Sequence, residues 1–271
     1  MSIEKLQAHW GFTAMPFRRD LPAASLLRFA AHAEAAARTR WLVDQHAFGV
    51  LTGEVGAGKT AAARAATAGL DASRHTLVYL PNPAVGARGI YNALVTALGE
   101  TPRFHYSSLI PQAADVLAAE TAERGRQVVL IIDEAHLMDT GQLEAVRLLT
   151  NADMDSRSPL ACLLIGQPTL RRRIKLGAFA ALDQRITLRY AMPGMSEKET
   201  KTYIAHHTAL AGRADTLFSD DAAALIHQNS RGLPRAVNNL GLAALIAAFA
   251  AGKSIVDESC ARAAVTEVAT D

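Results

Sequence analysis

The sequence lacks three features that would place it in a specialised class of protein. Its two cysteines, Cys162 and Cys260, are too few and too isolated for a disulfide framework or a CxxC zinc site. The longest apolar stretch, 240–251, has about half of the ~20 residues that a membrane-spanning helix needs. The first ten residues carry charges and no secretory signal. We therefore expect a cytoplasmic protein in a reducing compartment, with no membrane partner.

The sequence also lacks a marked excess of charge of either sign. Its 28 basic side chains nearly balance 26 acidic ones, which gives a formal net charge of +2. This balance provides no compositional argument for nucleic acid, so any such surface has to be a local patch. Half of the residues are hydrophobic, which is ordinary for a soluble chain that buries a core.

The spacing of apolar residues along the sequence changes near Pro193. Before it, short continuous apolar runs alternate with helical patterns, as is typical of a parallel sheet covered by helices on both faces. After it, the patterns are helical, with Ser196, Ser219 and Asp257 as expected N-caps. We predict an irregular segment over 1–28, an α/β domain over 29–193 and a helical lid over 194–271. The expected strands are 46–52, 76–80, 127–133, 160–167 and 186–190.

The strongest motif is a glycine-rich loop between a predicted strand and a predicted helix. The segment GEVGAGKT, residues 53–60, matches GxxxxGK[ST]. Backbone N–H groups of such a loop point at phosphate oxygens, and the following helix adds the positive end of its dipole. Lys59 would reach the β- and γ-phosphates, and the Thr60 hydroxyl would bind Mg²⁺. The predicted nucleotide-binding residues are Gly53, Glu54, Val55, Gly56, Ala57, Gly58, Lys59, Thr60 and Ala61.

A second motif, VVLIIDEAH, ends a buried strand with two carboxylates. Ligands of open α/β sheets bind at the carboxyl ends of strands, so Asp133 is the expected partner of Mg²⁺. Glu134 is placed to polarise an attacking water, which favours hydrolysis over binding alone. His136 completes a DEAH tetrad; it is either a helicase-like element or a hydrogen-bonding loop residue.

Taken in order, five motifs resemble those of the AAA+ ATPases. They are the glycine loop, IIDEAH, LLIGQP, LDQRI and GLPRAVNNL. Together with the opening WGFTAMPF, they resemble the branch that contains the general secretion protein ExeA (GspA) and the transposition regulators TnsC and TniB. The resemblance spans Trp10 to about Leu245. It implies a P-loop AAA+ α/β domain followed by an all-helical lid, with ATP and Mg²⁺ as cofactors and ADP and phosphate as products.

The resemblance also implies roles for individual residues. Gln167 matches sensor 1, which contacts the γ-phosphate or its water. Arg185 matches the arginine finger that reaches a neighbouring subunit's γ-phosphate. Arg235, which follows Pro234, matches sensor 2. For the N-terminal segment two interpretations stay open: Phe12, Pro16 and Phe17 close over the adenine, or the aromatic rings pack in a core.

Two groups of basic residues are candidate contacts to double-stranded DNA. One is Arg88 with Arg103, next to aromatic residues. The other is the run Arg171, Arg172, Arg173 and Lys175. The alternative for this run is a solvated face or a subunit interface.

From the resemblance we expect a regulator of DNA transposition. It would assemble with ATP into a ring or filament on double-stranded DNA and recruit or activate a transposase. The alternatives are an ExeA-like ATPase of a general secretion pathway and a helicase loader. Secretion members extend past the ATPase into a transmembrane segment and a peptidoglycan-binding module, whereas this sequence ends at Asp271, which favours transposition.

Overall fold

The computed structural model describes residues 2–151 and 158–270. These residues form two compact units. One consists of Ala33–Glu54 and Lys59–Met192 and holds the sheet. The other consists of the chain up to His32, Val55–Gly58 and the helices from Pro193 onward.

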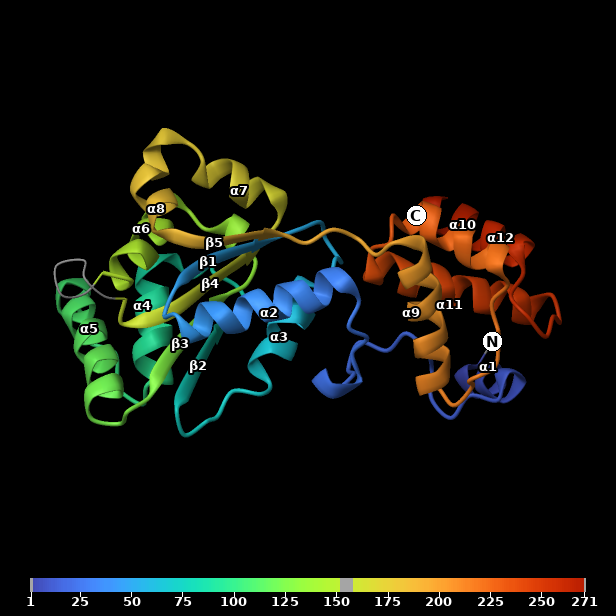
Figure 1. Cartoon of the computed structure of the whole chain (residues 1–271), viewed down its shortest axis with the longest axis horizontal. Helices are drawn as coiled ribbons and strands as arrows, with labels where there is room; N and C mark the ends of the chain where they lie inside the picture. The colour runs from blue at the N-terminus through green and yellow to red at the C-terminus, as the bar shows by residue number, and fades with distance from the viewer. Residues whose placement is uncertain (1, 152–157, 271) are drawn as a thin grey trace. The chain divides into compact units, whose positions relative to one another are not determined.

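The sheet has five parallel strands in the order β2-β3-β4-β1-β5 (Figure 1). Every residue of β1 and β4 is buried, as expected for strands covered on both faces. Thr52 pairs with Gly166, and Ile132 with Leu164, so the carboxyl ends of β1, β3 and β4 lie at one edge. The predicted parallel α/β fold is confirmed. The strands are β1 (Phe48–Thr52), β2 (His75–Leu80), β3 (Gln127–Ile132), β4 (Leu160–Gly166) and β5 (Ile186–Ala191).

Helices cover both faces of this sheet. On one face, a Cβ on Gly49 would lie 2.2 Å from Leu42 Cδ1, so glycine is what lets α2 (Ala30–Asp44) approach β1. Arg40 of α2 donates to Ala65 O of α3 (Lys59–Thr67), which places α3 beside α2. The other face carries the largest apolar core, built with α4 (Gly86–Ala97), α5 (Tyr106–Ala122) and α6 (Thr140–Leu149). After β4 the chain forms α7 (Pro168–Ile174) and α8 (Ala180–Arg185).

We call the second unit the helical unit. Three of its helices begin after the N-cap residues that the sequence predicts. Ser196 accepts from Glu199 N in a capping box, Ser219 Oγ accepts from Ala222 N, and Asp257 Oδ1 accepts from Cys260 N. Within the described part of the chain, none of the helices has both the length and the apolar character to cross a membrane. The helices are α9 (Glu197–Leu210), α10 (Asp220–Ser230), α11 (Pro234–Ala250) and α12 (Glu258–Thr270).

The prediction that residues 1–28 are irregular is wrong for 3–10. This segment forms α1 (Ile3–Trp10), with a Ser2 N-cap and Gly11 at φ +66° as its left-handed C-cap. A helix of eight residues is too short to be stable by propensity alone. Tertiary packing supports it instead: Trp10 is fully buried, and Arg213 of the helical unit donates to Trp10 O at 2.9 Å.

The aromatic residues that follow α1 pack inside the helical unit. Phe12 and Phe17 are both buried. The Phe17 ring stacks on His207 of α9 at 5.4 Å, and a Cβ on Gly241 of α11 would lie 2.7 Å from Phe17 Cζ. Of the two interpretations left open for these rings, the packing explains their position, because almost none of their surface is left to cover an adenine.

Candidate active site

The glycine-rich loop turns through two residues in the left-handed region. Gly56 has φ +81° and Gly58 has φ +92°, conformations that residues with a Cβ rarely adopt. The loop runs directly into α3, whose first N–H groups have no acceptor within the helix. A helix N-terminus of this kind attracts anions through these donors and through its dipole. The loop therefore has the backbone geometry of a phosphate cradle.

Lys59 lies folded over the loop that precedes it. Its Nζ donates to Gly53 O at 3.0 Å and to Glu54 O at 2.9 Å. Neutral carbonyls are weaker partners for an ammonium group than phosphate oxygens are. The side chain is thus in position to exchange these two contacts for contacts to a phosphate.

Asp133 joins the glycine-rich loop to strand β3. It is 5% exposed; its Oδ2 accepts from Thr60 Oγ1 at 2.6 Å and from Tyr79 OH at 3.1 Å. Its Oδ1 accepts from Glu134 N at 2.8 Å. Burial, together with the charge of Asp133, raises the pKa of Tyr79 to about 12, so the phenol stays a neutral donor.

Tyr79 is a site residue that our sequence reasoning missed. It lies next to the end of β2, beside Ile131 of β3. The available signal was its position near the carboxyl end of a predicted strand, the edge where ligands of such sheets bind. The partner of its hydroxyl depends on strand order, which the sequence pattern leaves open.

The Thr60 hydroxyl and the Asp133 carboxylate fit a magnesium site. Mg²⁺ prefers oxygen ligands and is held in nucleotide sites by one or two protein groups together with phosphates and waters. These two oxygens are 2.6 Å apart, at the start of α3. Across residues 2–151 and 158–270, no group of three or more His, Cys, Asp or Glu side chains could hold a metal on its own. The donors present thus suit an ion that also binds nucleotide oxygens.

Glu134 follows Asp133 in a strained backbone conformation. Its φ is +51°, which is uncommon for a residue with a side chain and recurs at functional sites. Its carboxylate is 53% exposed, so water can reach it. Oε2 lies 3.3 Å from Nδ1 of His136, a largely buried ring, although the pair lacks hydrogen-bond geometry. His136 therefore lies against the carboxylate expected to activate water.

Two further predicted residues lie close to parts of the glycine-rich loop. Gln167 is half-buried directly after β4, and the neighbouring Gly166 O accepts from Gly53 N at 3.3 Å. Gln167 is thus at the sheet edge that carries the glycine-rich loop. Arg235, in the first turn of α11, donates its backbone N–H to Gly56 O at 3.2 Å.

Arg185 lies at the opposite edge of the sheet. It ends α8 and precedes β5, so it is at the amino-terminal edge, and its Nη1 donates to Thr150 O at 3.3 Å. Asp133 and Gln167 follow the carboxyl ends of their strands. The structure therefore does not bring Arg185 to the phosphate site of its own subunit.

The basic run of α7 divides into exposed and inward-facing side chains. Arg171 and Arg172 are exposed. Arg173 is half-buried and donates to His136 O and Met138 O, whereas Lys175 pairs with Asp183 at 3.0 Å. We correct the expectation that Arg173 contacts DNA, because its guanidinium faces two carbonyls of the protein.

The other basic candidates surround an exposed aromatic ring. Phe104, between α4 and α5, is 77% exposed, and the Arg88 guanidinium lies 5.3 Å from the centroid of its ring. Arg88 Nη2 also donates to Phe104 O at 2.6 Å, while Arg103 is exposed. We call Arg88, Arg103 and Phe104 the α4–α5 tip.

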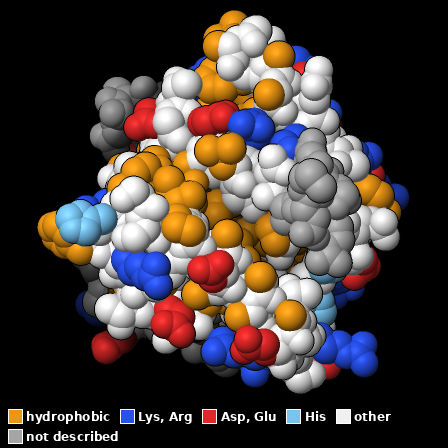
Figure 2. All heavy atoms as spheres, turned by 90° about the vertical axis from the view of Figure 1, so that its left-hand side faces the viewer, with side chains coloured by type: hydrophobic (Ala, Val, Ile, Leu, Met, Phe, Trp, Pro, Cys, Tyr) orange, Lys and Arg blue, Asp and Glu red, His pale blue; other side chains and the backbone are white. Residues whose placement is uncertain are grey.

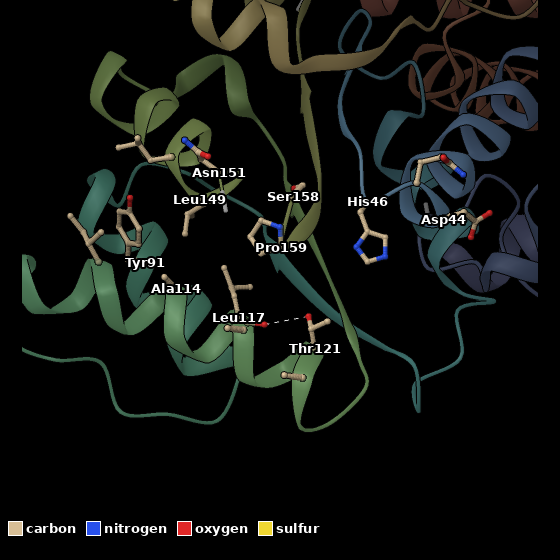
Figure 3. Close-up of a pocket in the computed structure, with 15 residues that line it drawn as sticks. Asp44, His46, Tyr91, Ala114, Leu117, Thr121, Leu149, Asn151, Ser158 and Pro159 are labelled. Carbon is tan, nitrogen blue, oxygen red and sulfur yellow. Dashed lines mark hydrogen bonds between the residues drawn. The ribbon is translucent and has the colours of Figure 1, made fainter. Parts of the chain in front are cut away.

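A groove of about 860 Å³ lies away from the glycine-rich loop and the carboxylates. Figure 2 shows hydrophobic side chains gathered on this face. The exposed Ile110 and Leu148 line the groove. Leu117 of α5 and Leu149 of α6 line it, with His46 before β1 and Pro159 before β4 (Figure 3). The groove thus lies at the amino-terminal edge of the sheet and is separate from the phosphate site.

Residues 43–174 match the family described as the AAA domain. General secretion pathway protein A of Aeromonas hydrophila is 35% identical to this chain over 228 residues, which are 82% of this chain and 41% of that protein. The chain therefore spans about two fifths of the length of this relative. This similarity supports the ExeA (GspA) part of the resemblance and gives no support to the TnsC and TniB part.

Solved structures with the same fold come from proteins of low sequence identity. The ORC2 protein of Aeropyrum pernix gives a TM-score of 0.66 at 19% identity, covering 93% of this chain and 71% of that one. Cdc6p of Pyrobaculum aerophilum gives 0.66 at 15% identity, covering 89% and 67%. The Thermotoga maritima RuvB Holliday junction branch migration motor gives 0.57 at 18%, covering 87% and 68%.

Proposed function

We propose that this chain, an AAA-type P-loop ATPase related to General secretion pathway protein A, hydrolyses ATP with Glu134 as the general base. The observation that carries the proposal is the bond between Thr60 and Asp133. It joins the glycine-rich loop to the strand whose end supplies Glu134. A phosphate cradle, a pair of magnesium ligands and an exposed carboxylate are thus brought together.

The loop and its lysine would hold the phosphates. The left-handed turns at Gly56 and Gly58 leave backbone N–H groups available, and Lys59 would exchange two carbonyls for phosphate oxygens. Thr60 and Asp133 would hold Mg²⁺, which supplies positive charge that neutralises the phosphate oxygens. Arg235, next to Gly56, is the proposed second cation at this end of the loop.

Glu134 and Gln167 would act on the attacking water. The Glu134 carboxylate accepts its proton as the oxygen approaches the γ-phosphorus, which is general-base catalysis. Gln167, at the same edge of the sheet, donates or accepts a hydrogen bond that orients the water or the γ-phosphate. Orientation of this kind lowers the barrier because the reacting atoms are held at attack distance.

Arg185 would complete the site of a neighbouring subunit. It lies at the sheet edge opposite to its own phosphate site. An arginine supplied from a second molecule is worth about 10³ to 10⁵ in rate. Hydrolysis would therefore depend on assembly of this chain with further copies of itself.

For the biological role, we favour an ATPase of a general secretion pathway over our sequence-based expectation of transposition. The support is the 35% identity to General secretion pathway protein A over 82% of this chain. A match over 228 residues extends beyond the short motifs that all P-loop proteins share.

A cellular secretion assay tests this role. We expect loss of the gene from its own organism to lower the amount of exported protein in the medium, with the protein retained in the cells. The wild-type gene should restore export, and Glu134→Gln should not. Normal export in the deletion strain would contradict the secretion role.

The α4–α5 tip favours a second candidate, an ATP-assembled regulator on double-stranded DNA that recruits or activates a transposase. Exposed arginines neutralise phosphates, and an exposed aromatic ring can contact bases. Because the net charge is only +2, one copy would bind weakly, whereas an assembly multiplies a few contacts per copy.

Fluorescence anisotropy on two unrelated duplexes tests the second candidate. The second candidate requires that the protein binds both duplexes when an ATP analogue is present, with an affinity that falls steeply as the salt concentration rises. Arg103→Ala should weaken both duplexes equally, because phosphate contacts carry no sequence information. Arg262→Ala, which removes an exposed arginine paired with Glu258, is the control. No binding at low salt in any nucleotide state would exclude this candidate.

A further inference from the structure

Arg173 differs from the two arginines before it in helix α7. Arg171 and Arg172 are exposed, whereas Arg173 is half-buried. Its Nη1 donates to Met138 O at 2.6 Å and to His136 O at 3.2 Å. Its guanidinium also lies 5.7 Å from the centroid of the Phe179 ring. The head group is thus held between an aromatic face and two backbone carbonyls.

Both carbonyls belong to the turn that follows Glu134. This turn is one short 3₁₀ helix, Ala135–Leu137, with Glu134 as its N-cap and Met138 as its C-cap. Ala135 and Met138 are almost completely buried, and buried carbonyls need donors. On the other side, a Cβ on Gly166 would lie 3.1 Å from His136 N, so the end of β4 runs directly against the turn. The turn is therefore held both by the end of β4 and by α7.

The strained backbone of Glu134 explains why such a support is needed. A non-glycine residue at φ +51° persists when its surroundings fix it there. Asp133 Oδ1 fixes the amide N–H of Glu134, on one side of this residue. Arg173 binds the carbonyls that follow it, on the other side.

We infer that Arg173 is a positioning residue for ATP hydrolysis, because it fixes the turn that sets the direction of the Glu134 carboxylate. It acts through the carbonyls of His136 and Met138, which both accept from its Nη1. Its planar guanidinium also lies against the Phe179 ring, a contact that the shorter and non-planar head group of lysine cannot reproduce. The inference rests on the proposed role of Glu134 as general base.

The experiment compares Arg173→Ala and Arg173→Lys with wild type in a steady-state phosphate-release assay. Misplacement of a catalytic group by about 1 Å costs roughly 10²-fold in rate. We expect Arg173→Ala to lower kcat by about 10- to 100-fold, while KM and the Kd for a non-hydrolysable ATP analogue stay within about twofold. Arg173→Lys should recover part of kcat, because its ammonium group keeps N–H donors but lacks the planar head group that lies against Phe179.

Arg124→Ala is the matched control. Arg124 Nη1 also donates to a carbonyl, Leu98 O, in the same unit, but this carbonyl follows α4 and not Glu134. We expect Arg124→Ala to leave kcat unchanged even if the melting temperature falls. A loss of kcat in Arg124→Ala equal to that in Arg173→Ala would overturn the inference, since any lost arginine–carbonyl bond would then suffice.

Three further outcomes are distinguished. If wild type hydrolyses ATP and Arg173→Ala keeps its kcat within twofold, the inference is wrong and the proposed function stands. If wild type hydrolyses no ATP, the proposed function itself fails. If circular dichroism shows that Arg173→Ala is unfolded, Arg173→Met decides the question, because methionine keeps much of the side-chain length and has no N–H donor. Wild-type kcat in Arg173→Met would contradict the inference.

Discussion

At the scale of single residues, Asp133 is where three parts of the chain meet. Its two oxygens accept from Thr60 of α3, Tyr79 of β2 and the backbone of Glu134. Loss of any of these donors would therefore change the position or the hydrogen bonding of the carboxylate that would hold Mg²⁺. The same coupling explains why the glycine-rich loop has to keep its backbone conformation, because Thr60 is positioned by the turn that precedes it.

Gly56→Ala should reduce nucleotide binding. The new Cβ would lie 2.7 Å from Arg235 Cβ, and φ +81° is unfavourable for alanine, so the loop has to move. We expect at least a tenfold weaker affinity in a titration with a fluorescent ATP analogue. Gly69→Ala is the control, because a Cβ there meets no atom within 4 Å. Equal affinity for wild type and Gly56→Ala would mean that the loop does not bind phosphate.

At the scale of elements, α9 carries an ionisable group in the core of the helical unit. His207 is buried between the rings of Phe17 and Tyr203. Burial, and to a lesser extent neighbouring His206, lowers the pKa of His207 to about 4. In the folded unit the imidazole of His207 is therefore neutral above about pH 4. In the unfolded chain it has an ordinary pKa, near 6.5.

The stability of the helical unit should fall as the pH drops from 6.5 towards 4. In this window the unfolded chain binds a proton at His207 and the folded chain does not, so protonation favours unfolding by up to about 3 kcal/mol. Above pH 6.5 both states carry a neutral His207, so this loss of stability is absent. We expect His207→Phe to lose less stability than wild type over that range, as measured by urea unfolding at several pH values. Identical pH profiles would contradict the burial of a neutral imidazole.

Elements that local sequence patterns specify could be predicted from the sequence, whereas those that depend on tertiary contacts could not. Continuous apolar runs identified β1, β3 and β4, because strands covered on both faces have no polar alternation. The edge strands β2 and β5 are partly exposed and were identified by short runs of apolar and β-branched residues. Helix α1 was missed because Trp10 is stabilised by a residue 203 positions later, Arg213. The roles of Tyr79 and Arg173 depend on which strand and turn lie beside them, which no local pattern states.

At the scale of the whole molecule, the proposed role of Arg185 would make one copy incomplete by itself. It lies at the sheet edge opposite to the phosphate site of its own unit. A site completed by a neighbour makes ATP a ligand that stabilises assembly, because it binds the assembled form more tightly. This expectation is independent of whether the assembly serves secretion or DNA.

Assembly should therefore depend on nucleotide and on Arg185. We expect size-exclusion chromatography with light scattering, at micromolar protein, to show a larger species with a slowly hydrolysed ATP analogue than with ADP. Arg185→Ala should bind the analogue with normal affinity and lack this species. Arg262→Ala serves as the control for loss of an exposed arginine. A wild-type protein that stays monomeric with the analogue and DNA would contradict the role of Arg185.

The most direct measurement of the central claim is phosphate release by wild type and Glu134→Gln, with the affinity of each for an ATP analogue measured in parallel. The substitution keeps the shape of the side chain and removes the charge that accepts a proton. We predict that the two proteins bind the ATP analogue with equal affinity within about twofold, and that Glu134→Gln releases phosphate about 10²- to 10⁴-fold more slowly than wild type. Equal rates of phosphate release by the two proteins would contradict it.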